Sequence, residues 1–220
     1  MPRLKVGVLI SGRGSNLQAL IDAATDTAYP AEIVAVISNR ADAAGLTHAA
    51  AAGIPRHVVA HPDRGTFATN ADRILHEAKV ELVALAGYMR ILETSFVGSW
   101  TDRLVNIHPS LLPAFPGLHP QRQALAAGVK FSGCTVHFVR AAVDTGPIIA
   151  QAVVPVEDGD DEDRLAARIL AAEHRLYPLA VRLFAESRLR VEGNRVLVGG
   201  ATAPDIAALN PTESLASGAG

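Results

Sequence analysis

Short apolar runs alternate with helical patterns along the first half of the chain, and this alternation limits the possible folds more than any other feature. Strands are predicted at residues 4–10, 32–38, 56–60, 82–87 and 103–109. Helices are predicted between them, where apolar residues recur at helical spacing, at residues 17–24, 43–53 and 66–80. Such strand–helix alternation favours an α/β fold with a Rossmann-like, mostly parallel sheet flanked by helices.

The pattern changes in the last third of the chain. Two apolar runs, residues 132–140 and 146–156, are separated only by a turn, so they are predicted to be antiparallel strands at the C-terminal edge of the sheet. Residues 160–187 have a helical pattern with an acidic first turn, which suits the helix dipole. Pro178 is predicted to kink or split this helix, and residues 189–199 are predicted to form a small hairpin.

The length of 220 residues suits a single domain. We expect that domain to span residues 1–200 and to be followed by a mobile tail, residues 201–220, which is poor in large apolar side chains. The net charge of −2 and the scattered basic residues argue against a nucleic-acid partner. No apolar run reaches the roughly 20 residues of a membrane-spanning helix, and the N-terminal run is too short for a signal segment.

A single cysteine, Cys134, excludes an intramolecular disulfide framework and a zinc site built from several cysteines. Nothing else in the sequence requires a metal. We therefore expect a cytoplasmic protein with no membrane partner. A homodimer is compatible with the sequence, which contains no argument for one.

The turn "SGRGSN", residues 11–16, connects the first predicted strand to the first helix. Backbone N–H groups and the helix dipole favour an anion at such a turn. The third glycine of a dinucleotide fingerprint is replaced by Leu17. Two interpretations therefore stay open, a phosphate site formed by Gly14, Ser15 and Asn16, or a tight turn in which Ser15 or Asn16 caps the helix.

Asn106 and His108 alternate at the end of the strand predicted at 103–109. Residues i and i+2 share one face of a strand, and ligands of open α/β sheets bind at the carboxyl ends of the strands. An imidazole can move protons near neutral pH, an amide can donate to an oxyanion, and Asp144 could orient the imidazole. The alternative is that both side chains only pack or cap a turn. His119 and His137 are weaker candidates, as a helix N-terminal residue and a cross-strand packing residue.

At these residues the sequence resembles the folate-dependent phosphoribosylglycinamide formyltransferases. The similar segments occur in order over about residues 5 to 195 and read "SGRGSNLQALID", "ISNRADAAGL", "LAGYMRIL", "LVNIHPSLLPAFPGLH", "VHFV", "DTGPII" and "EHRLYP". The resemblance implies the formyltransferase fold and the transfer of a formyl group from 10-formyltetrahydrofolate to the amine of glycinamide ribonucleotide, in de novo purine biosynthesis.

The resemblance also implies roles for individual residues. His108 would be the principal catalytic residue, Asn106 would help to bind the oxyanion, and Asp144 would hold His108 or a water. The ribonucleotide would be bound by Gly14, Ser15, Asn16 and Glu173. The folate would be bound by Arg64, Met89, Arg90, Ile91, Leu92, Asn106 and Val143. Without the resemblance, Glu173 would be read as a solvated carboxylate on a helix.

The sequence departs from the pattern of the family at a few positions. Leu170 is apolar where relatives carry a polar residue, Pro120 and Gln121 replace a small or polar residue and a histidine, and Thr145 replaces a common glycine. None of these positions is Asn106, His108 or Asp144.

Three other functions compete with this interpretation. Formyltetrahydrofolate hydrolase shares the catalytic trio but carries an N-terminal regulatory domain, for which a strand beginning at residue 4 leaves no room. Methionyl-tRNA formyltransferase shares "HPSLLP" but needs a C-terminal tRNA-binding domain and a basic surface. A nucleotide-binding module without activity would bind its ligand whether or not His108 is present.

Overall fold

The strands predicted from the apolar runs form one sheet in the computed structural model, which describes residues 2–60, 63–204 and 207–211. The strands are β1 Leu4–Ile10, β2 Ala31–Ser38, β3 Arg56–Val58, β4 Leu82–Leu85, β5 Leu104–His108, β6 Phe131–Phe138, β7 Ile148–Pro155, β8 Leu189–Glu192 and β9 Arg195–Val198. The helices are α1 Ser15–Thr25, α2 Gly45–Ala51, α3 Arg64–Glu77, α4 Thr94–Ser99, α5 Pro120–Ala126 and α6 Glu162–Ala185.

The order of the strands across the sheet is β3-β2-β1-β4-β5-β6-β7-β9-β8. The strands β1 to β5 are parallel to one another, whereas β6 is antiparallel to both β5 and β7. The predicted α/β class and the antiparallel strands near the C-terminal edge are therefore confirmed. The hairpin of β8 and β9 also forms, and β9 joins the sheet by pairing Arg195 with Ile148 of β7.

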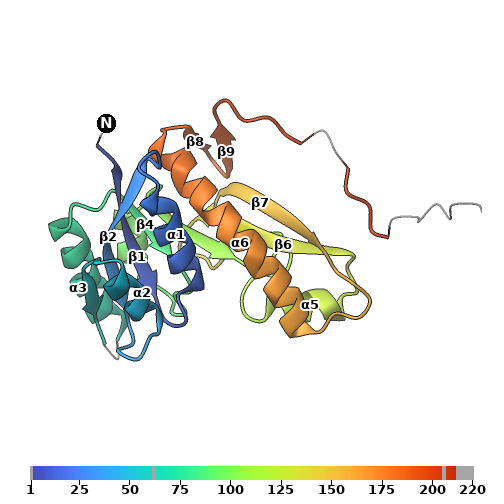
Figure 1. Cartoon of the computed structure of the whole chain (residues 1–220), viewed down its shortest axis with the longest axis horizontal. Coiled ribbons are helices and arrows are strands. Elements are labelled where there is room, and N and C mark those ends of the chain that lie inside the picture. The colour runs from blue at the N-terminus through green and yellow to red at the C-terminus, as the bar shows by residue number, and fades with distance from the viewer. Residues whose placement is uncertain (1, 61–62, 205–206, 212–220) are drawn as a thin grey trace, which may run out of the picture.

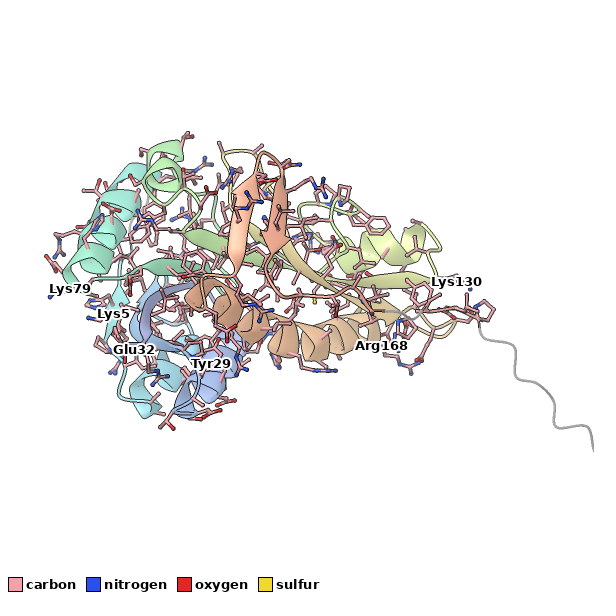
Figure 2. The ribbon with its side chains drawn as sticks, turned by 90° about the horizontal axis from the view of Figure 1, so that it is seen from above. Lys5, Tyr29, Glu32, Lys79, Lys130 and Arg168 are labelled. Carbon is pink, nitrogen blue, oxygen red and sulfur yellow. The ribbon has the colours of Figure 1, made fainter. Side chains whose placement is uncertain are left out.

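Helices cover both faces of the sheet (Figure 1). Alternate side chains of β1 point to opposite faces, so Val8 packs with the core under α1, α2 and α6, whereas Leu9 packs with the core under α3 and α4. Both side chains are fully buried. The sheet is long, and Lys79, just after α3, and Lys130, just before β6, lie at opposite ends of the molecule (Figure 2).

The helix α6 is continuous through Pro178, so of the two predicted outcomes, a kink or a split, the split does not occur. Proline removes one hydrogen bond from a helix interior. Here the buried side chains of Leu176, Tyr177, Ala180 and Val181 lie on both sides of it, and their packing holds the helix together. No helical period marks α4 or α5 in the sequence, since six and seven residues are too few to establish one. The one indication of α5 was His119, which was expected at a helix N-terminus.

The predicted boundary of the domain lies two residues after β9, which ends at Val198. Part of the predicted tail, residues 205–206 and 212–220, lies outside the described residues. Within the described part, the Asn210 side chain donates hydrogen bonds to the carbonyl oxygens of Lys130 and Val156, at 2.5 and 3.0 Å. None of the helices in the described ranges is long and apolar enough to cross a membrane.

Candidate active site

The carboxyl ends of β1 and β4 are joined by the side chain and backbone of Ser11. Its backbone N–H donates to the Gly87 carbonyl at 3.2 Å. Its hydroxyl donates to Asn39 Oδ1 at 2.7 Å and accepts a hydrogen bond from the backbone N–H of Met89 at 2.9 Å. The loops that follow three parallel strands are thus fixed together, at the edge of the sheet where α/β proteins bind their ligands.

His108 and Asp144 form a buried pair at the end of β5. The His108 Nδ1 atom lies 3.4 Å from Asp144 Oδ2, and the two side chains are 7% and 9% exposed. Nε2 of His108 lies 3.0 Å from the carbonyl oxygen of Phe115, and Gly117 donates its backbone N–H to Asp144 Oδ2 at 2.8 Å. Because a carbonyl can only accept, Nε2 carries the proton in the neutral ring, and Nδ1 is the basic atom that faces the carboxylate.

Asn106 faces His137 across the strands β5 and β6, which pair these two residues directly. Asn106 Nδ2 lies 3.3 Å from His137 Nε2, and His137 Nδ1 lies 3.0 Å from the Phe138 carbonyl oxygen. By the same argument Nδ1 of His137 donates, so Nε2 accepts from the Asn106 amide. Burial lowers the pKa of His137, although the Asp144 carboxylate opposes this. The neutral ring therefore fixes which way the Asn106 amide points.

The loop between β5 and α5 is held against β6 by Thr135. The Thr135 hydroxyl donates to the carbonyl of Ser110 at 2.7 Å and accepts a hydrogen bond from the backbone N–H of Leu112 at 3.0 Å. Gln151 Nε2 donates to both Thr135 Oγ1 and the Leu112 carbonyl. Since this loop supplies Phe115 and Gly117, its fixed path also fixes His108 and Asp144.

A narrow cavity of about 140 Å³ opens beside this group. Its walls are the segments after β4 and after β6, and Asn106 and His137 contribute polar atoms to its lining. Among the residues predicted to bind folate, those that line this cavity are Arg90, Ile91, Leu92, Asn106 and Val143. Met89 lines a second cleft instead, and Arg64, the exposed first residue of α3, lines neither.

The second cleft has a volume of about 630 Å³ and lies between the glycine turn and one face of α6. The turn contributes residues 12–16, and the strand ends contribute Ala86, Gly87, Met89 and Pro109. The face of α6 contributes Asp163, Ala166, Ala167, Ile169, Leu170 and Glu173. All four residues predicted to bind a ribonucleotide, Gly14, Ser15, Asn16 and Glu173, therefore line one cleft.

Gly14 precedes α1 with a left-handed φ of 77°, and no side chain caps the helix. The alternative in which Ser15 or Asn16 caps the helix is therefore wrong, because Asn16 is already inside α1 and bonds elsewhere. A Cβ atom on Gly14 would lie 2.5 Å from the Cα atom of Gly45. The turn can thus approach α2 only with glycine at this position.

Glu173 is a buried carboxyl, not the solvated one that a helical glutamate usually is. Asn16 Nδ2 donates to Glu173 Oε2 at 2.8 Å, which joins α1 to α6. Burial raises the pKa of Glu173, and the hydrogen bond from Asn16 opposes this in part. The Asn16 Oδ1 atom is buried without a hydrogen-bond partner, so the cleft retains an acceptor that a ligand could satisfy.

Two of the residues at which the sequence departs from the family, Leu170 and Gln121, line this cleft. Pro120 occupies the first turn of α5, where its missing N–H costs nothing. The Thr145 hydroxyl donates to the Ala142 carbonyl at 3.0 Å, within the turn that carries Asp144. Among the described residues, no group of three or more His, Cys, Asp or Glu side chains is placed to hold a metal ion.

His137 belongs to the site, although the sequence marked it only as a weaker candidate that could equally be a cross-strand packing residue. Its imidazole contacts Asn106 and lies 3.7 Å from Asp144. The available signal was the position of His137 in the strand that follows β5, but only the register of β6 against β5 shows that it faces Asn106. The other weaker candidate, His119, is the residue before α5, as expected of a helix N-terminal residue.

Comparisons with known proteins show which family the chain resembles. Residues 4–181 match the sequence profile of a protein family described as formyl transferase. The phosphoribosylglycinamide formyltransferase of Escherichia coli is 45% identical over 204 residues, which cover 91% of this chain and 96% of that protein. The trifunctional purine biosynthetic protein adenosine-3 of Drosophila pseudoobscura pseudoobscura is 57% identical over 194 residues. This chain spans only 14% of the length of that trifunctional protein.

Solved structures show the same fold. A glycinamide ribonucleotide transformylase 1 from Symbiobacterium toebii superposes with a TM-score of 0.87 at 52% identity, covering 90% of this chain and 94% of that one. A formyltetrahydrofolate deformylase from Pseudomonas syringae has a TM-score of 0.85 at 29% identity, covering 90% of this chain and 66% of that one. The fold alone therefore does not separate transfer to an amine from transfer to water.

Proposed function

The chain belongs to the formyl transferase family, and we propose that it transfers the formyl group of 10-formyltetrahydrofolate to the amine of glycinamide ribonucleotide, a step of purine biosynthesis. Support comes from the Escherichia coli relative, of which 96% is matched and whose name states this acceptor. The proposal covers the domain of residues 1–200 and needs only two small molecules as partners.

One observation carries the proposal, namely that the same two segments, residues 86–92 and the end of β5 with the residue after it, contribute walls to two different cavities. The segment 86–92 lines the narrow cavity with some of its residues and the larger cleft with others. Asn106 lines the first, and Pro109, next to His108, lines the second. A transferase needs this arrangement because the donor and the acceptor must meet at the catalytic groups.

The larger cleft suits a phosphorylated sugar. The first turn of α1 has backbone N–H groups with no partner inside the helix, and these can bind a phosphate. Glu173 and the unpartnered Asn16 Oδ1 can accept hydrogen bonds from hydroxyl or amine groups of the same molecule. The narrow cavity, with its apolar walls, suits the flat pteridine of the folate.

The reaction begins when the glycinamide nitrogen attacks the formyl carbon, which forms a C–N bond and places negative charge on the formyl oxygen. The Asn106 amide has a second N–H that His137 does not use, and this N–H can donate to the oxyanion. His137 keeps that amide in the donating orientation. When the tetrahedral intermediate collapses, the bond between the formyl carbon and N10 of the folate breaks.

Proton transfer balances the reaction, because the attacking amine loses one proton and N10 of the leaving tetrahydrofolate gains one. His108 can hold this proton at Nδ1, and the Asp144 carboxylate at 3.4 Å stabilises the imidazolium that results. The hydrogen bond from His108 Nε2 to Phe115 keeps the ring in this orientation throughout. We place the reaction in the cytoplasm, where a free buried thiol such as Cys134 is stable.

The test is an absorbance assay of tetrahydrofolate formation from the formyl donor, with and without glycinamide ribonucleotide. The proposal predicts product only when the ribonucleotide is present. Product formed at the same rate without it would identify a hydrolase, as the similarity to the deformylase structure would allow. Binding of both ligands with no product in either case would identify a binding module.

A further inference from the structure

The ribonucleotide cleft is lined by two carboxylates and one basic side chain, so its suitability for a phosphate depends on that basic residue. Glu173 and Asp163 contribute carboxylates from α6, and the glycine turn contributes neutral N–H groups. A phosphate dianion in the cleft would be repelled by both carboxylates. Among the residues that line the cleft, the one lysine or arginine is Arg13, in the middle of the turn.

Arg13 differs from two other arginines near the cleft because none of the residues that the structure describes is its partner. Its side chain is exposed and forms no hydrogen bond or ion pair with any described residue. By contrast, Arg122 of α5 pairs with Glu162, and Arg168 of α6 pairs with Asp160. The Arg13 guanidinium is therefore available to a ligand, and binding a ligand would break no existing contact.

A second observation indicates that a ligand of the cleft needs a hydrogen-bond donor as well as an anionic group. Asn16 is buried, its amide nitrogen is occupied by Glu173, and its Oδ1 atom has no partner. That atom can only accept a hydrogen bond, so it needs a donor such as a sugar hydroxyl or an amine. The cleft thus offers a cation at the turn, which suits the phosphate of a sugar phosphate. The acceptors beside it suit the sugar hydroxyls of the same molecule.

We propose that Arg13 is the residue that makes the enzyme specific for a phosphorylated acceptor, because its guanidinium pairs with the phosphate of the ribonucleotide. This inference rests on the proposed function and deepens it. The planar guanidinium can donate two parallel hydrogen bonds to phosphate oxygens, which a neutral turn cannot replace. The charge of Arg13 also offsets the repulsion from Asp163 and Glu173.

The test compares the phosphorylated acceptor with glycinamide riboside, which lacks the phosphate. For Arg13→Ala we expect kcat/KM for the ribonucleotide to fall about 10-fold, mainly through KM, as loss of one charged hydrogen bond would cause. The value for the riboside should not change. Arg13→Lys should recover part of the loss, since lysine restores the positive charge but not the pair of parallel hydrogen bonds that a guanidinium donates. Arg175→Ala is the matched control, because Arg175 is exposed on α6 and does not line the cleft.

Equal losses with both acceptors, or no loss with either, would overturn the role of Arg13. A binding measurement separates this result from failure of the proposed reaction. By calorimetry, Arg13→Ala should weaken the binding of ribose 5-phosphate about 10-fold, and this readout needs no turnover. Unchanged binding of ribose 5-phosphate would contradict the inference even if the enzyme formylates the ribonucleotide. Weakened binding with no formylation by the unaltered enzyme would contradict the proposed function alone.

Discussion

The catalytic group at the end of β5 and the ribonucleotide cleft differ in how completely their polar atoms are paired. His108, His137 and Asp144 all have partners within the protein, and these partners fix the protonated atom of each ring. In the cleft, Asn16 retains an unpaired oxygen, and Glu173 is buried with one hydrogen bond from a residue 157 positions away. The first region is preorganised for chemistry, and the second is completed only by its ligand.

This difference predicts that substitutions in the two regions change different quantities, kcat in the first region and ligand affinity or stability in the second. A change at the catalytic group should lower kcat and leave the affinity for the ribonucleotide intact, since none of its side chains lines the ribonucleotide cleft. A change in the cleft should alter affinity or the stability of the fold, since its polar atoms are not fully satisfied.

The largest effect is expected for His108→Ala. Loss of the group that holds the proton should lower kcat about 1,000-fold. The affinity for the ribonucleotide, measured by calorimetry, should stay within a factor of a few, because His108 does not line the cleft. His76→Ala, a change at an exposed histidine of α3, serves as the control. A His108→Ala enzyme with a near-normal rate would remove this residue from the mechanism.

The next effect is expected at Asn106 and His137, which we predict to act as one unit. Asn106→Ala should lower kcat about 100-fold, as removal of an oxyanion donor does. His137→Ala should lower kcat about 10-fold by releasing the amide. The double variant should be no slower than Asn106→Ala alone. If the two losses multiplied instead, His137 would act on the reaction independently of the amide.

A smaller effect on catalysis and a larger one on affinity are expected for Gly14→Ala. The added Cβ would meet the backbone of Gly45, and the φ of 77° is unfavourable for alanine. Ribonucleotide affinity should therefore fall by more than 10-fold, with folate affinity changed much less. Gly53→Ala is the control, because Gly53 also has a positive φ but its Cβ would contact nothing. Equal loss of affinity for both ligands would indicate general misfolding.

The smallest of the four effects is expected for Glu173→Gln, and it is a change in the stability of the fold. A carboxyl whose pKa is raised by folding favours the folded state below its unfolded pKa, and this contribution is lost as pH rises through the folded pKa. Each unit of that shift amounts to about 1.4 kcal/mol. The glutamine variant should therefore have the higher Tm at pH 8, with ribonucleotide affinity reduced. A Tm below that of the unaltered protein at pH 8 would show that the ionised carboxyl stabilises the fold.

The same comparison explains what the sequence could and could not predict. The parallel strands follow from apolar runs, and Asn106 and His108 share a face because they are two residues apart in one strand. The partner of Asn106 depends on the register of β6, which no local pattern reveals. The burial of Glu173 depends on a contact with Asn16 across most of the chain, so only the family resemblance marked it.

Short helices and the path of α6 were missed for related reasons. The seven residues of α5 carry too little periodicity to define its bounds, although His119 was expected at a helix N-terminus. The prediction that Pro178 kinks or splits α6 used a local rule. The helix does not split, because the packing of Tyr177 against the sheet outweighs the lost hydrogen bond. The Tyr177 hydroxyl donates to the carbonyl oxygens of Leu85 and Val105, both in the sheet.

The central claim is that the formyl carbon moves from the folate to the amine. A direct test uses a donor labelled with ¹³C in the formyl group, with the ribonucleotide present, and follows the label by NMR. We expect the label to appear in the formamide of the ribonucleotide product, and His108→Ala to slow its appearance. Appearance of the label in free formate instead, at the rate of donor consumption, would contradict the account.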